Sequence, residues 1–254
     1  MTVTFILFLA AVLPPLYLGR KIYRLDRIEP EPAKLLRKLF LFGAVATIPA
    51  MILEGAADYI LGRLISNGDV YLFVEVFAGV ALVEELCKYF FLKRTTWRSP
   101  EFNFRFDGIV YAAFTSLGFA ALENIMYVFS NGLGTAVARA LLSIPGHCIF
   151  GIYMGYYYGL AKQADYAGDE NQSRRNRRLA LLVPTILHGI YDYLAFAMSV
   201  YTDANNEPRL WIIGAFLVFV IVMDIVSIRT VKQAAGEDIR IAPGYYGQDQ
   251  FSDR

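Results

Sequence analysis

Seven apolar stretches follow one another along this chain of 254 residues, separated by short polar segments. They cover residues 2–18, 38–57, 70–92, 107–130, 135–161, 179–200 and 210–228. About 20 helical residues cross the hydrocarbon core of a bilayer, which is about 30 Å thick. The stretches are continuously apolar rather than alternating, which argues against a membrane β-barrel. The sequence therefore predicts an all-α, polytopic membrane helix bundle with about seven transmembrane helices.

The composition supports one compact membrane domain. Hydrophobic residues make up 56% of the chain and charged residues only 19%, whereas soluble domains have about 25% charged residues. We expect a single transmembrane domain over residues 1–228 and a flexible cytoplasmic tail over residues 229–254. Both cysteines, Cys87 and Cys148, lie inside apolar stretches, so a structural disulfide is not expected.

The basic residues predict the orientation of the chain. The segments after the first, third, fifth and seventh stretches hold 20 of the 24 lysine and arginine residues. Cytoplasmic loops carry such an excess, so the N-terminus is expected outside and the C-terminus in the cytoplasm. The first stretch has no basic residue before it, which favours a retained anchor over a cleaved signal. We expect a multi-pass protein of a bacterial or archaeal cell membrane.

Two adjacent glutamates, Glu84 and Glu85, interrupt the third stretch in the string A-L-V-E-E-L-C-K, and Lys88 follows one helical turn after Glu84. A charged side chain at bilayer depth costs at least about 2.5 kcal/mol on insertion scales. Two acids and a lysine would therefore disfavour insertion unless the protein needs them there. This group indicates chemistry inside the membrane.

The next three stretches each carry ionisable groups as well: Glu123, then His147, then His188 with Asp192. These are the only two histidines of the chain. Residues four apart share a helix face, so Asp192 can fix the tautomer of His188. At a helical rise of about 1.5 Å per residue, most of these groups come out near mid-membrane, with Glu123 nearer the outer side. One intramembrane cluster is expected.

Two local features refine this cluster. Adjacent helical residues point about 100° apart, so Glu84 and Glu85 should have different tasks, one facing the site and the other facing neighbouring helices. Pro145 and Gly146 precede His147, and a proline inside a helix kinks it. A kink there would open room beside the histidine.

Such a set of side chains can perform hydrolysis. A carboxylate can act as general base on water while a second group stabilises the oxyanion. Alternatively, histidines and carboxylates can hold a divalent metal, zinc, that activates the water. The predicted catalytic residues are Glu84, Glu85, Lys88, Glu123, His147 and His188. The predicted metal ligands are Glu123, His147, His188 and Asp192. Glu54, Asp58, Glu75 and Asp224 are expected to lie outside the site.

The motifs E-E-x-x-K at Glu84–Lys88, F-x-x-x-E at Glu123, P-G-H at His147 and H-x-x-Y-D at His188–Asp192 are similar to those of the PrsW family of intramembrane proteases. The resemblance implies an endopeptidase that cuts a membrane-protein or peptide substrate. A characterised relative starts cleavage of a membrane-spanning anti-sigma factor. It also implies distant kinship with the CAAX prenyl-protease and bacteriocin-processing superfamily, which is argued to be glutamate-dependent, whereas PrsW is labelled a metalloprotease.

Three alternatives remain open at the level of sequence. Buried glutamates and histidines also form proton relays, which would suit a proton-coupled transporter, although the chain shows no inverted repeat. A CAAX-like prenyl-protein processing protease would have arginine rather than Lys88, one residue further on, and histidine rather than Glu123. A non-catalytic membrane scaffold is the third. No nucleic-acid partner is expected.

Overall fold

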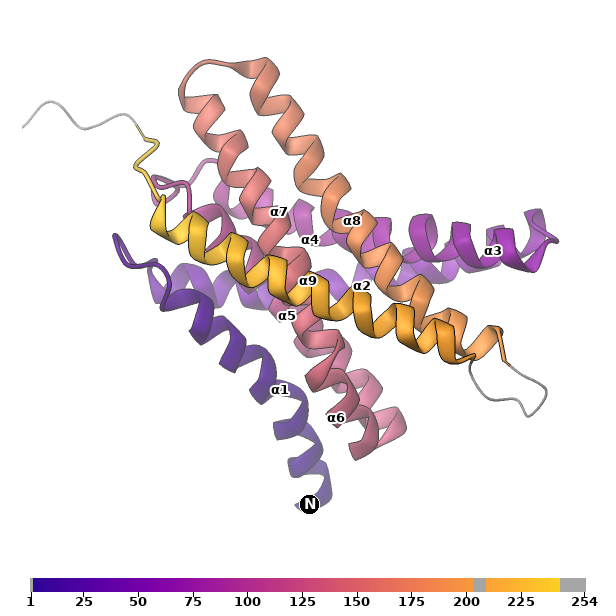
Figure 1. Ribbon diagram of the computed structural model, residues 1–254. Helices are drawn as coiled ribbons and strands as arrows, with labels where there is room; N and C mark the ends of the chain where they lie inside the picture. The colour runs from indigo at the N-terminus through magenta and orange to yellow at the C-terminus, as the bar shows by residue number, and fades with distance from the viewer. Residues whose placement is uncertain (1, 203–208, 243–254) are drawn as a thin grey trace, which may run out of the picture.

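The computed structural model describes residues 2–202 and 209–242, and these residues are almost entirely helical (Figure 1). The helices are α1 (Thr2–Tyr23), α2 (Ala33–Leu64), α3 (Gly68–Val74), the π-helix η1 (Glu75–Ala81), α4 (Leu82–Thr96), α5 (Asp107–Asn131), α6 (Leu133–Leu141), α7 (Ser143–Tyr166), α8 (Glu170–Val200) and α9 (Leu210–Gly236). The described residues contain no β-strand, and Phe104 forms an isolated antiparallel bridge with Arg240. The all-α prediction is confirmed.

Six helical stretches are long and apolar enough to cross a membrane: α1, α2, α5, α6 with α7, α8 and α9. The remaining predicted span, residues 70–92, lies within the uninterrupted helical run of α3, η1 and α4. This run carries the buried charges Glu84, Glu85 and Lys88 and is not among the six. The expectation that this helical run crosses the membrane therefore rests on the apolar stretch and on the alternation of basic segments in the sequence.

Helix α5 is the centre of the bundle and packs against α1, α2, α4 and α7. Glycines permit the closest of these approaches. A Cβ atom on Gly155 of α7 would collide with the backbone of Gly108 and Ile109 in α5, and one on Gly159 would collide with the carbonyl of Arg105. The glycines spaced by four in α7 thus pack within the bundle against α5, as the small-residue pattern of membrane helices allows.

Replacing Gly155 with alanine is expected to lower the free energy of unfolding by about 1–3 kcal/mol, because the new methyl group meets backbone that cannot yield. The loss should appear as a lower Tm of the detergent-solubilised protein. Gly214→Ala in α9 is the matched control, since a Cβ there meets nothing within 4 Å and alanine is the better helix former. A Gly155→Ala protein as stable as Gly214→Ala would contradict the close packing.

Two irregularities lie next to the ionisable residues. The first is η1, in which the N–H of Leu82 bonds to the carbonyl of Phe77, five residues back; π-helical segments are rare and often occur at functional sites. The second is the break at Leu142 (φ −121°), after which α7 begins. Pro145 therefore lies in the first turn of α7, where a proline is tolerated. The candidate span Leu133–Tyr166 is thus interrupted at Leu142, three residues before the proline, and the helix restarts there instead of bending at Pro145.

The C-terminal boundary also differs from the expected one. Helix α9 runs to Gly236, past residue 229. The residues that follow contact the segment before α5, where Arg105 N–H donates to the carbonyl of Ile239 and Ile241 N–H donates to that of Asn103. Residues 243–254 of the predicted tail lie outside the described part of the chain.

Reporter fusions at two turns test the predicted orientation. A reporter inserted after Gly168, in the turn between α7 and α8, is expected to score as cytoplasmic, and one inserted after Ser66, between α2 and α3, as external. The reason is the positive-inside bias, since Arg174, Arg175 and Arg178 follow the first turn closely. Paired phosphatase and fluorescent-protein fusions measure each side independently. The opposite pattern at both turns would invert the orientation.

Candidate active site

The paired glutamates and the lysine of α4 form a buried ion cluster. Glu84, Glu85 and Lys88 are 5%, 0% and 0% exposed. The ammonium Nζ of Lys88 lies 3.0 Å from Oε2 of Glu84 and 2.8 Å from Oε1 of Glu85. It also stands 4.2 Å from the ring centroid of Phe119. Because one ammonium serves two carboxylates, the cluster holds both acids in fixed positions and retains an excess negative charge.

His147 of α7 joins this cluster to Glu123 of α5. Its Nδ1 lies 3.2 Å from Nζ of Lys88, and its Nε2 lies 2.9 Å from Oε2 of Glu123. An ammonium can only donate, so Nδ1 is the acceptor and the ring hydrogen is on Nε2, which donates to the carboxylate. Arg139 forms an ion pair of 2.8 Å with the same oxygen of Glu123. The contacts thus define one tautomer of His147.

His188 of α8 is held by carboxylates at both ring nitrogens. Its Nδ1 lies 3.0 Å from Oε1 of Glu85, and its Nε2 lies 3.1 Å from Oδ2 of Asp192 and 3.9 Å from Oε2 of Glu84. The ring also stacks on Phe150, with centroids 4.6 Å apart. The contact with Asp192 is the one expected from their four-residue spacing. The position of His188 is thereby fixed from three sides.

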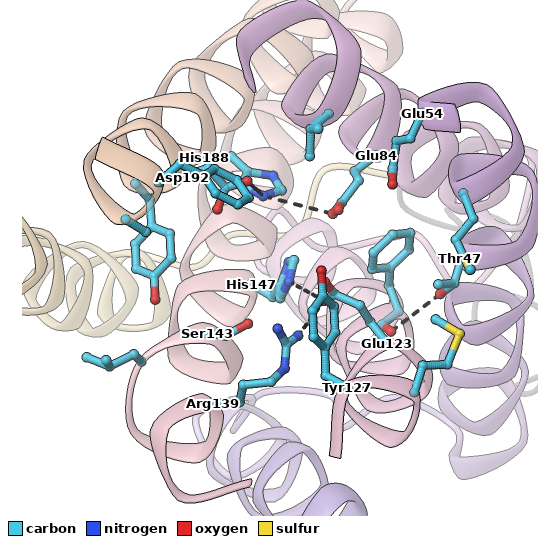
Figure 2. A pocket seen from close by; sticks show the side chains of 18 of the residues that line it. Thr47, Glu54, Glu84, Glu123, Tyr127, Arg139, Ser143, His147, His188 and Asp192 are labelled. Atoms are coloured by element: carbon cyan, nitrogen blue, oxygen red, sulfur yellow. Dashed lines mark hydrogen bonds and ion pairs between the residues drawn. The ribbon is translucent and has the colours of Figure 1, made fainter. Parts of the chain in front are cut away.

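These side chains face a cavity of about 870 Å³ between α2, α5, α7 and α8 (Figure 2). The predicted residues that line it are Glu84, Glu123, His147, His188 and Asp192. Glu85 and Lys88 do not line it. Glu84 and Glu85 therefore point in different directions, as expected from the offset of about 100° between adjacent helical residues. Glu84 is open to the cavity and Glu85 lies behind it.

Four further charged residues line the cavity. Glu54, Asp58 and Glu75 were expected to lie outside the site, but they belong to the lining, together with Arg139. A signal for Glu54 existed in the sequence, because it follows Thr47 by seven residues, which places both on one helix face. Asp224, also expected outside, is not among the lining residues.

One group within the site has the arrangement of a metal centre. One ligand atom each of Glu84, His147 and His188 lies within 4.8 Å of the other two. This set differs from the predicted one, since Glu84 takes the place of Glu123 and Asp192, which contact the two histidines instead. Two imidazoles and one carboxylate form a protein donor set known from catalytic zinc sites. The donor types therefore fit a divalent metal, which on binding would take one ring nitrogen of each histidine from its present partner, Lys88 or Glu123 at His147 and Glu85 or Asp192 at His188.

Comparison with known proteins identifies the family of this chain. Residues 31–226 match the PrsW family intramembrane metalloprotease model. Protease PrsW of Oceanobacillus iheyensis is 38% identical over 82% of this chain and 92% of its own length, and that of Geobacillus kaustophilus is 36% identical over 91% and 93%. Protease PrsW of Clostridioides difficile is 34% identical over 85% and 86%. No solved structure matches. The chain belongs to the PrsW family and is a membrane protease.

Proposed function

We propose that this protein is an intramembrane endopeptidase that hydrolyses a peptide bond in or near the membrane segment of another membrane protein. The observation that carries the proposal is the position of Glu84. Its carboxylate lines the cavity, is 5% exposed, and is held by the ammonium of Lys88 at 3.0 Å. A buried, oriented carboxylate beside two histidines is suited to activating a water molecule.

We assign a separate role to each of the other residues of the site. Glu84 accepts the proton of the attacking water. Glu85 holds Nδ1 of His188 at 3.0 Å, and the Nε2–H of His188 passes from Asp192, 3.1 Å away, to the oxygen of the scissile carbonyl as that oxygen develops negative charge. Lys88 is a positioning residue, since it binds both glutamates from behind the cavity. On the other side, Glu123 orients His147 through the contact of 2.9 Å.

We further propose that Glu84, His147 and His188 hold a divalent metal, with zinc as the ion that this donor set favours. Bound there, the metal would polarise the scissile carbonyl and lower the pKa of a water molecule. Glu85 and Glu123 each contact one of the two histidines, and partners of this kind orient imidazole ligands and raise their basicity. Glu84 is required in either arrangement, as ligand or as base.

The substrate we propose is a single-span protein of the cell membrane, of the anti-sigma factor class that the PrsW resemblance implies. The lining of the cavity combines apolar side chains such as Met51 and Phe150 with a small set of charged groups that point into it. Sites of this character bind organic ligands, which supports a peptide substrate. The apolar helices around it support a multi-pass location.

A reconstituted system tests this proposal. The purified protein is placed in liposomes with single-span anti-sigma factors from the same organism, and fragment masses are determined. We expect one cut, in or within a few residues of the substrate's span. The Glu84→Gln protein in the same liposomes is the matched control. If wild-type protein yields no fragment that the control lacks, for any of these substrates, the substrate class is wrong.

A further inference from the structure

A second buried group of carboxylates lies at the other end of α5, far from the cavity. Asp26 and Glu31 come from the connection between α1 and α2, and Asp107 is the first residue of α5. They are 5%, 4% and 0% exposed, and one oxygen of each lies within 4.8 Å of the other two. Asp107 precedes Glu123 by 16 residues, which is about 24 Å of helix. This group is separate from the active site.

The group has no positive partner among the residues that the structure describes. No lysine, arginine or histidine lies within ion-pair distance of any of the three carboxylates in that part of the chain. The charges that do lie nearby are further carboxylates, Asp238 and Glu29 near Asp26 and Glu101 near Glu31. Burial, and then the neighbouring carboxylates, raise the pKa of the Asp26 and Glu31 carboxyls. Buried charges in proteins are normally paired or coordinated to a metal, so holding the three carboxyls of the group ionised together requires a cation.

Neutral donors hold the oxygens of this group in place. The N–H of Glu31 donates to Oδ2 of Asp26 at 3.2 Å, and the hydroxyl of Tyr111 donates to Oε2 of Glu31 at 2.7 Å. The N–H groups of Asn103 and Phe104 donate to Oδ2 of Asp107 at 3.0 and 2.7 Å. Four donors thus orient the three carboxylates without neutralising them.

One oxygen of the group receives no N–H donor, although the carboxyl of Glu31 lies within hydrogen-bond reach of the Asp107 carboxyl. Oδ1 of Asp107 is fully buried and makes no hydrogen bond in the described part of the chain, although Asp107 itself is 0% exposed. Unpaired buried oxygens are rare, and each requires an explanation such as an ion or water. Since Asp107 belongs to the group whose oxygens converge, this orphaned oxygen indicates a ligand position rather than a packing defect.

We propose that Asp26, Glu31 and Asp107 bind a hard divalent cation, Mg²⁺ or Ca²⁺, at the end of the bundle that the basic residues predict to be cytoplasmic. The three side chains offer only carboxylate oxygens, which suit these ions and not the softer metals that imidazole or thiolate ligands select. The cation joins the connection between α1 and α2 to the start of α5, and its function is to stabilise that junction.

Cation titration of the full-length protein tests this site. Detergent-solubilised protein is freed of metal with EDTA, dialysed, and titrated separately with Mg²⁺ and Ca²⁺ while its Tm is measured. A ligand that binds only the folded state raises Tm with concentration, so we expect a saturable rise with at least one of the two ions. The response to each ion alone identifies which one the site prefers.

Two substitutions tie the response to these residues. Asp26→Asn and Asp107→Asn each remove one charged ligand, and both are expected to raise the half-saturating concentration by about tenfold or more. Asp26→Asn, in a connecting segment, keeps the test valid if Asp107→Asn does not fold. Glu170→Gln is the matched control, because Glu170 is an exposed carboxylate on the same predicted side of the membrane and pairs with Arg174 at 3.4 Å, and it should respond as wild type.

Two results would overturn the proposal. One is a wild-type Tm that neither ion changes, together with an Asp26→Asn protein that is more stable than wild type; the carboxylates would then share protons instead of a cation. The other is an Asp26→Asn protein that responds to the ions as wild type does. Neither result bears on the protease site, whose residues are unchanged in these variants.

Discussion

Replacing Glu84 with glutamine is expected to reduce cleavage of a membrane-protein substrate by at least about 10²-fold, the usual effect of removing one base or oxyanion group. The amide has the shape of the carboxylate but cannot accept a proton from water or serve as an anionic metal ligand. Folding should be preserved, because Lys88 keeps its shorter contact, 2.8 Å, with Glu85. Turnover and Tm are measured on the same preparation.

The matched control for this result is Asp224→Asn. Asp224 is also a partly buried carboxylate of a membrane helix, but it does not line the cavity, so its loss should leave turnover near the wild-type value. Wild-type turnover by the Glu84→Gln protein would remove Glu84 from the mechanism. A large fall in the Tm of the Glu84→Gln protein, without a fall in that of Asp224→Asn, would instead assign Glu84 a structural role.

Removal of the metal is expected to abolish cleavage and to lower Tm, and added zinc should restore both. The physical reason is that an ion bound only by the folded state stabilises it by mass action. A chelator selective for transition metals, such as 1,10-phenanthroline, is used with Mg²⁺ and Ca²⁺ held constant, so that the carboxylate group at Asp107 is not disturbed. Metal content is measured by elemental analysis at each step.

The His188→Ala protein is the control for the metal test. It lacks one of the three ligands, so it should contain little metal, and the chelator should not change its Tm. Full activity of the wild-type protein after exhaustive chelation, with no metal left in the sample, would establish a glutamate mechanism without metal. His188 would then act on the oxyanion alone, and His188→Ala would still lower turnover.

The helices and the side-chain pairs within one helix could be predicted because both follow from short-range patterns. The length of each apolar stretch determines a helix, and four-residue spacing placed Glu84 with Lys88 and His188 with Asp192, contacts that the structure contains. These inferences need only the helical period. They hold whatever the arrangement of the helices relative to one another.

The contacts that could not be predicted are those that depend on how the helices tilt and rotate relative to one another. Depth counted along straight helices placed Glu123 nearer the outer side, yet its carboxylate lies 2.9 Å from His147. The grouping of Glu84 with the two histidines depends on how three different helices approach one another. Glu54 shares a helix face with Thr47, but only the packing of α2 shows that this face borders the cavity.

A π-helix precedes the paired glutamates, so the direction in which Glu84 and Glu85 point depends on how many residues lie between them and the start of that helical run. Seven consecutive residues, Glu75–Ala81, follow the wider winding, and deleting one of them would let the chain continue as an ordinary α-helix. Because a π-helix closes each hydrogen bond over one more residue than an α-helix does, that deletion would leave Glu84 in phase with α3. A residue lost from the α-helical Leu82–Val83 would instead rotate Glu84 relative to η1 by about 100°, while every residue of the E-E-x-x-K motif stayed the same. The rotation of α4 about its own axis, and not only the identity of its residues, therefore determines whether Glu84 faces the cavity.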